Sequence, residues 1–137
     1  MAATKVEKKQ AVEPIIITDP DINKEYKLEF NRKSIARTER AGFDINEIDS
    51  KPMTMIPLFF WGAFQWHHPN MTTVQTDKIL FEEFGGPMAM MKIKNEDGVT
   101  IVERLAQLYN LPFGALSDDE DEEGKTEGNP LRMTVKF

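Results

Sequence analysis

The chain of 137 residues has no cysteine, no apolar run long enough to span a membrane and no excess of basic residues. Without cysteine it forms no disulfide, no zinc–thiolate site and no thiol nucleophile. Its longest apolar segment covers residues 53–66, short of the roughly 18 residues that a membrane span requires. The first ten residues lack the apolar region of a secretory signal, so we expect a cytoplasmic protein.

The net charge of −6 is concentrated near the C-terminus. Seven acidic residues follow Ser117, whereas the rest of the chain is nearly neutral. A body without a basic stripe argues against nucleic acid as the main ligand, because phosphate neutralisation dominates such binding. The acidic run over residues 118–123 is typical of a solvated linker, and its alternative reading is a surface that mimics DNA.

Signatures of enzyme chemistry are also missing. The chain contains no GxSxG, Walker A or GxGxxG motif. His67 and His68 are adjacent, so on a helix they point in different directions and do not suit one metal ion. We therefore expect no enzyme activity, no cofactor, and no catalytic, cofactor-binding or metal-binding residues.

The N-terminal half predicts a hairpin followed by a short helix. Residues 15–17 are β-branched, and residues 25–30 alternate, with the turn at residues 19–23 between them. Asn31 is the expected N-cap of a helix that ends where Gly42 takes a positive φ.

Three further helices are predicted in the middle of the chain. The apolar segment is expected to become helical near Thr54, with Pro57 in its first turn and Pro69 stopping it. Thr72 has capping-box spacing before a helix with a stripe formed by Val74, Asp77, Leu80, Phe81 and Phe84. The last helix places Ile101, Val102, Leu105, Leu108 and Tyr109 on one face, with Asp97 as its cap.

The expected fold is therefore α+β: an N-terminal β-hairpin packed with about four α-helices, in a single domain over residues 14–112. Residues 1–13 are predicted to be a flexible arm, and residues 113–137 an acidic tether with a strand-like tail. In that tail Leu131, Met133, Val135 and Phe137 share one face. Such a strand pairs either with its own hairpin or with a partner by strand addition, and the pattern does not choose between them.

The order of these elements, with YKLEF, ERAGFDI, WGAFQWHHPNMTT and DKILFEEFGG in turn, resembles the tail assembly chaperones of long-tailed, siphovirus-type bacteriophages. The resemblance covers about residues 15–109 and is sharpest over residues 58–73, where an apolar helix ends in a His-Pro turn before a Thr-capped helix. It rests on the pattern of elements rather than on an invariant motif.

The resemblance implies a non-enzymatic chaperone in the host bacterial cytoplasm that is absent from the mature virion. Such proteins bind and solubilise the tape measure protein and help to recruit tail tube subunits, in many phages also through a longer, frameshifted product. Self-association is expected, and neither nucleic acid nor membrane is an expected partner. The alternatives are a structural head–tail or tail protein of a phage and a small acidic regulatory protein that mimics DNA.

A chaperone of this kind has to cover apolar stripes of its client reversibly, so some large apolar residues are predicted to line a groove for a client helix. Trp61 and Trp66 are the best candidates for partial exposure, because interfaces favour tryptophan; the competing reading places all of these residues in the core. The candidate partner-binding residues are Phe59, Phe60, Trp61, Phe64, Trp66, Met88, Met90, Met91, Leu131, Met133, Val135 and Phe137.

Overall fold

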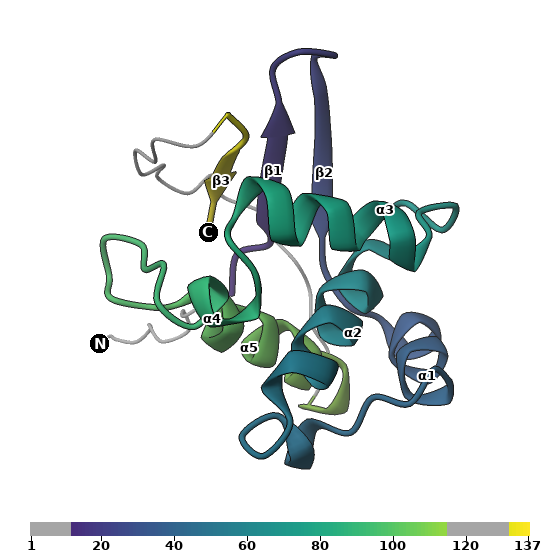
Figure 1. Ribbon diagram of the computed structural model, residues 1–137. Coiled ribbons are helices and arrows are strands. Elements are labelled where there is room, and N and C mark those ends of the chain that lie inside the picture. The colour runs from purple at the N-terminus through teal and green to yellow at the C-terminus, as the bar shows by residue number, and fades with distance from the viewer. Residues whose placement is uncertain (1–11, 115–131) are drawn as a thin grey trace, which may run out of the picture.

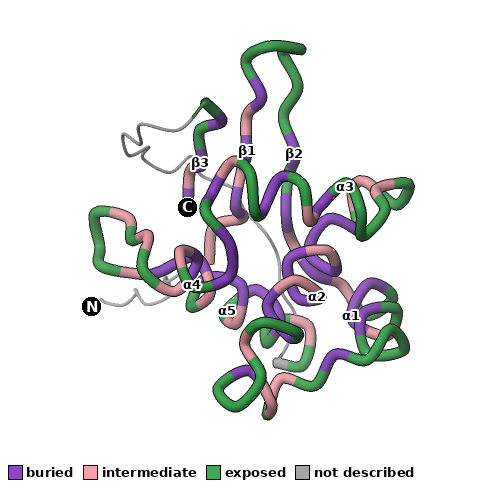
Figure 2. Tube along the Cα trace, viewed as in Figure 1, coloured by how far each residue is buried: buried purple, intermediate pink, exposed green. Residues whose placement is uncertain are grey.

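The predicted hairpin forms as expected and begins the sheet (Figure 1). A computed structural model of the chain describes residues 12–114 and 132–137. Strand β1 (Ile15–Asp19) pairs antiparallel with β2 (Lys24–Leu28), and Ile17 lies opposite Tyr26. Inward-facing side chains alternate with outward-facing ones along both strands, as the period of two requires. The hairpin tip projects beyond the helices and is exposed (Figure 2).

A third strand, β3 (Thr134–Lys136), completes the sheet in the order β2-β1-β3. It runs antiparallel to β1, with Val135 opposite Ile17. Of the two pairings that the sequence left open, the structure has the one within the chain's own sheet. The fold class is α+β, as predicted: a three-stranded antiparallel sheet packed with helices.

Local capping signals account for three of the helix starts. Helix α1 (Arg32–Arg40) and helix α3 (Thr73–Lys78) each begin with a complete capping box, on Asn31 and Thr72 respectively. Helix α5 (Ile101–Gly114) is capped by Thr100, whose hydroxyl accepts from the Glu103 amide. The prediction that Asp97 caps this helix was wrong, because the amide of Asp97 instead donates to the side chain of Asn95 within the preceding turn.

Helix α2 (Pro52–Phe64) differs from its prediction at both ends. It starts at Pro52 rather than near Thr54, so Pro57 lies in its interior instead of its first turn. The carbonyl that Pro57 leaves without a donor belongs to Met53, an exposed residue where water can replace the missing bond. The helix also ends before Pro69 is reached, through a turn in which the Gln65 amide donates to the Gly62 carbonyl.

The segment after α3 continues as a π-helix, η3 (Ile79–Glu83), before the single turn α4 (Pro87–Met90). A π-turn holds more residues than an α-turn, so it rotates the buried face relative to a regular helix. Leu80 and Phe84 are buried as predicted, but Val74 and Phe81 are exposed. The predicted apolar stripe was therefore wrong at these two positions.

The core forms around the aromatic residues of α2. The Phe59 ring stacks on Phe43 with centroids 4.5 Å apart and also contacts Phe30 and Tyr109. Phe43 follows the loop after α1 and precedes the 3-10 turn η2 (Ile45–Glu47), so distant parts of the sequence meet at one ring. Gly42 has the predicted positive φ of 113° and turns the chain back towards this cluster.

The structure describes only part of the two predicted terminal segments. In the N-terminal arm (1–13), the structure describes only Val12 and Glu13, and Val12 packs against the core. The rest of the arm, the acidic run and Leu131 lie outside the described residues.

Candidate partner-binding surfaces

Four of the predicted partner-binding residues lie in the core. Phe59, Phe60, Phe64 and Met90 are almost completely buried. The three phenylalanines are covered because α2 is apolar on nearly all sides and packs against the sheet and the neighbouring helices, and Met90 is buried at the end of α4. They are not exposed to a partner in this structure, and their partner-binding role stays a prediction.

The strand face is also taken up by the chain itself. Met133, Val135 and Phe137 are buried against the sheet and the core. Their alternation signalled a strand with one buried face, but the surface that buries it belongs to the same chain. In this structure they are therefore not exposed to a partner, and their partner-binding role stays a prediction.

The two tryptophans lie at the surface, as predicted. Trp61 is half-buried, and its indole N–H donates to the Met71 carbonyl over 3.1 Å. Trp66, just beyond the end of α2, is 42% exposed and stacks on the His67 ring with centroids 4.5 Å apart. Trp66 is thus an aromatic side chain held in place on one face and open to solvent on the other.

A groove opens beside Trp66, between α1 and the turn that follows α2. Its volume is about 430 Å³, within the range of small binding pockets. The turn contributes Gln65, Trp66 and Pro69 to its lining. The α1 side contributes polar and basic residues: Asn31, Lys33, Ser34, Arg37 and Arg40.

Close packing of the two helices fixes this groove. Gly62 of α2 lies directly against Thr38 of α1, and a Cβ atom added at Gly62 would collide with the Thr38 side chain. The Thr38 hydroxyl donates to the Ser34 carbonyl, so its position is also determined. At the other side of α1, the Tyr109 hydroxyl donates to a Glu39 carboxylate oxygen over 2.6 Å. Burial and the Glu39 carboxylate both raise the pKa of Tyr109, so this hydroxyl stays a donor.

The cations of the groove have no carboxylate partner among residues 12–114 and 132–137. Lys33, Arg37 and Arg40 make no ion pair there, and Arg37 instead donates to the Gln65 side-chain oxygen over 3.0 Å. These three residues were not among the predicted binding residues. Their spacing of i, i+4 and i+7 in a predicted helix was the signal that could have found them.

The histidine pair supports the strand rather than a metal ion. The His67 Nε2 lies 2.8 Å from a Glu29 carboxylate oxygen. The His68 Nε2 accepts from the Lys27 amide over 3.0 Å, which ties the turn after α2 to β2. Burial, together with Lys24 and His67, lowers the pKa of His68, so its neutral, accepting form is favoured. The part of the chain that the structure describes contains no cluster of three possible metal ligands.

A second surface feature lies at α4. Met88 is about half exposed and Met91 half-buried, whereas Phe81 is exposed and packs beside Gly86 at the start of the same turn. Among the predicted methionines, Met88 and Met91 thus remain accessible. This apolar corner lies outside the lining of the groove beside Trp66.

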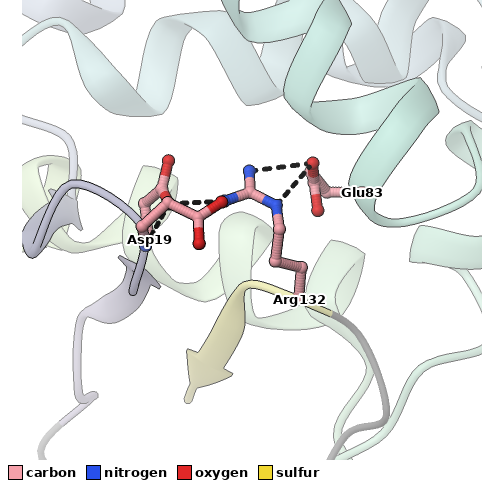
Figure 3. Close-up of polar contacts among 4 residues, drawn as sticks. Asp19, Glu83 and Arg132 are labelled. Atoms are coloured by element: carbon pink, nitrogen blue, oxygen red, sulfur yellow. Dashed lines mark hydrogen bonds and ion pairs between the residues drawn. The ribbon is translucent and has the colours of Figure 1, made fainter.

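Away from the groove, Arg132 is the centre of an ionic cluster (Figure 3). The Arg132 guanidinium lies 2.5 Å from Asp19, 2.7 Å from Asp21 and 2.9 Å from Glu83. Its hydrogen bond lowers the pKa of Asp19. These contacts join the start of the C-terminal segment to the hairpin and to η3.

A buried arginine completes this attachment of β3. Arg104 of α5 is only 8% exposed, and it donates to the Phe137 main-chain oxygen over 2.9 Å and to the Glu13 carbonyl over 3.1 Å. Asn95 donates to the same Phe137 oxygen over 2.7 Å. Burial lowers the pKa of Arg104, but a guanidinium remains charged at any physiological pH.

The protein is therefore an α+β protein with a basic groove edged by Trp66 and a C-terminal strand held by Arg104 and Arg132. The chain belongs to the family described as a domain of unknown function (DUF5055), whose model matches residues 1–137. No curated protein and no solved structure matches the chain. None of the helices in the described ranges is long and apolar enough to cross a membrane.

Proposed function

We propose that this protein is a phage tail assembly chaperone that binds and solubilises the tape measure protein and helps to recruit tail tube subunits, without enzyme activity. The observation that carries the proposal is the exposed Trp66 at the edge of an open groove between α1 and the end of α2. It supports a binding role, because partly exposed, well-anchored tryptophans are typical of protein interfaces.

The position of the groove adds support. The segment in which the resemblance to tail assembly chaperones is sharpest, residues 58–73, contributes Gln65, Trp66 and Pro69 to the groove lining. The same segment contains the turn anchored by His68 and the Thr72 cap of α3. The residues that suggested the family resemblance therefore build a surface, as well as part of the core.

The groove suits a reversible partner. It is open, and its aromatic contact is one exposed ring rather than a deep apolar cavity. An amphipathic client helix can lay its apolar face against Trp66 while the chaperone's own core stays closed. Release during tube assembly then requires no unfolding of the chaperone.

The test is co-expression with the neighbouring gene's tape measure protein, followed by solubility and co-elution measurements. We expect a soluble complex with the wild-type chain and loss of co-elution with Trp66→Ala. Phe81→Ala is the matched control, because Phe81 has nearly the same exposure but lies outside the groove lining. An insoluble client beside a soluble wild-type chain contradicts the proposal, and loss with Phe81→Ala alone moves the binding surface to the α4 corner.

The alternatives leave different traces. A structural phage protein would be found by mass spectrometry in purified virions, where we expect this chain to be absent. A DNA mimic would lose its effect when the acidic residues 118–123 are replaced by their amides, a change that we expect to leave client binding intact. Deleting the whole tail is unsuitable for this purpose, because residues 133–137 contribute buried side chains to the core.

A further inference from the structure

We infer that the groove beside Trp66 recognises a helical segment of a partner protein that carries a row of carboxylates next to an apolar side chain. This inference rests on the proposed function only for the identity of the partner, which would then be the client. The carboxylates would pair with the basic row of α1, formed by Lys33, Arg37 and Arg40, and the apolar side chain would cover Trp66.

The spacing of the basic row fits a helix. Lys33, Arg37 and Arg40 follow one face of α1 over roughly 10 Å, at 1.5 Å of rise per residue. Acidic side chains placed once per turn on a partner helix have the same spacing. A segment that lies along α1 can therefore meet all three cations together.

Among the described residues, no carboxylate of the chain pairs with the basic row. Elsewhere in the described residues the chain saturates an exposed arginine with its own carboxylates, as Arg132 does with Asp19, Asp21 and Glu83. No such carboxylate reaches Lys33, Arg37 or Arg40 within residues 12–114 and 132–137.

Arg37 is already oriented for this role. It uses one N–H group on the Gln65 side chain, whose amide nitrogen in turn donates to the Trp61 and Met71 carbonyls. A guanidinium has five N–H donors, so Arg37 retains donors for a bidentate bond to a carboxylate. Less side-chain freedom is lost on binding when the side chain is held beforehand.

The charge of the whole protein favours a protein carboxylate over a nucleic acid. The chain carries a net charge of −6, and the groove offers only three basic side chains. Nucleic acids bind through many neutralised phosphates along an extended basic surface, and the rest of this protein would repel them. Trp66 is nevertheless able to stack on a base, so single-stranded DNA is the opposing probe.

The experiment compares three proteins with defined probes by fluorescence anisotropy. The probes are a synthetic amphipathic helix with one glutamate per turn and a leucine beside them, the same peptide with lysine in place of glutamate, and single-stranded oligo(dT). The proteins are the wild type, the groove variant K33E/R37E/R40E and the control variant K78E/K92E/K94E. Both triple variants have the same charge change, at exposed positions, and circular dichroism checks that both are folded.

We expect the glutamate peptide to bind the wild type and the control variant alike, and at least about tenfold more weakly to the groove variant. The groove variant should instead prefer the lysine peptide, and salt should weaken both interactions because the pairs are exposed. Equal loss in both triple variants, no preference between the peptides, or tighter binding of oligo(dT) overturns the inference.

The same variants separate this inference from the proposed function. If the tape measure protein co-elutes equally with the wild type and the groove variant, the carboxylate-binding role fails while the chaperone stands. If the peptide preference is observed but the tape measure protein never co-elutes, the groove chemistry stands and the proposed function fails.

Discussion

Arginines at the two ends of this molecule have opposite surroundings. At the β3 end, Arg104 and Arg132 direct their N–H groups to main-chain oxygens and carboxylates of their own chain. At the α1 end, Arg40 makes no ion pair within the described residues, and Arg37 has a single neutral partner. The first pair closes the fold over its last strand, and the second leaves charge on the surface.

This difference separates structural cations from candidate binding cations. The buried guanidinium of Arg104 has to be satisfied internally, because an unpaired buried charge costs more than one ordinary hydrogen bond, whereas the exposed Arg132 is held by three carboxylates of its own chain. An exposed guanidinium is solvated and contributes little to stability, so its position in a groove is not explained by folding. Stability measurements on matched variants can therefore test the distinction directly.

The largest effect is expected from Arg104→Met. This change removes the donor to the Phe137 and Glu13 oxygens and leaves buried acceptors short of a partner. We expect the free energy of unfolding in urea to fall by about 2–4 kcal/mol. The control is Arg40→Met in α1, which should stay within about 0.5 kcal/mol of the wild type. Equal losses for the two variants would remove the distinction.

Gly62→Ala should give the next largest loss. The new methyl group collides with Thr38, which pushes α1 away from α2 and widens the groove. Overpacking of this kind lowers the free energy of unfolding by about 1–3 kcal/mol. The better helix propensity of alanine offsets up to about 1 kcal/mol of this loss. In a double-mutant cycle, Thr38→Ala should relieve part of the loss, because it removes the two closest atoms. Strictly additive losses would contradict the close contact.

Arg132→Gln should act locally. The change releases Asp19, Asp21 and Glu83, so amide hydrogen exchange should speed up in β3 more than in α2. The same substitution at Arg40 should leave exchange in every strand unchanged. If the protection of β3 amides from exchange is unaltered in Arg132→Gln, the apolar face of β3 alone holds the strand.

The smallest expected effect concerns pH and His68. Burial lowers the pKa of His68 below its ordinary value of 6.5, and in the unfolded chain the same imidazole binds a proton more readily. The stability that neutral His68 contributes is therefore present above pH 6.5 and is lost as the pH falls below it. In thermal melts between about pH 8 and pH 5, the wild type should lose stability more steeply than His68→Gln. Parallel pH profiles would contradict this.

Local signals in the sequence predicted most elements of the fold. The hairpin and the caps at Asn31 and Thr72 were recognised because each depends on residues close together in the chain. The start of α2 was missed because an interior proline is tolerated when the carbonyl it orphans is exposed, which depends on tertiary packing. The exposure of Phe81 was missed because a π-turn changes the period on which the prediction relied.

The candidate site was only partly predictable. The sequence favoured Trp61 and Trp66 for partial exposure because interfaces favour tryptophan, but it also kept the buried Phe59 and Phe60 among the candidate binding residues. Which aromatic side chain is covered depends on where α5 and the sheet pack, and the linear pattern of a helix that is apolar all round carries no such information. The basic row of α1 was visible as a helical spacing, but only the structure shows that no carboxylate of the described residues pairs with it.

The amino-acid sequence was enough to predict the fold class, the hairpin, the caps at Asn31 and Thr72 and the apolar central helix, because each follows from short-range periodicity and local hydrogen bonding. Only the tertiary structure decided that β3 pairs within its own chain, that Arg104 and Arg132 are satisfied internally, and that Trp66 and the basic row of α1 share one groove. These features bring together residues far apart in the chain, and their energies depend on burial and on which opposite charges lie nearby.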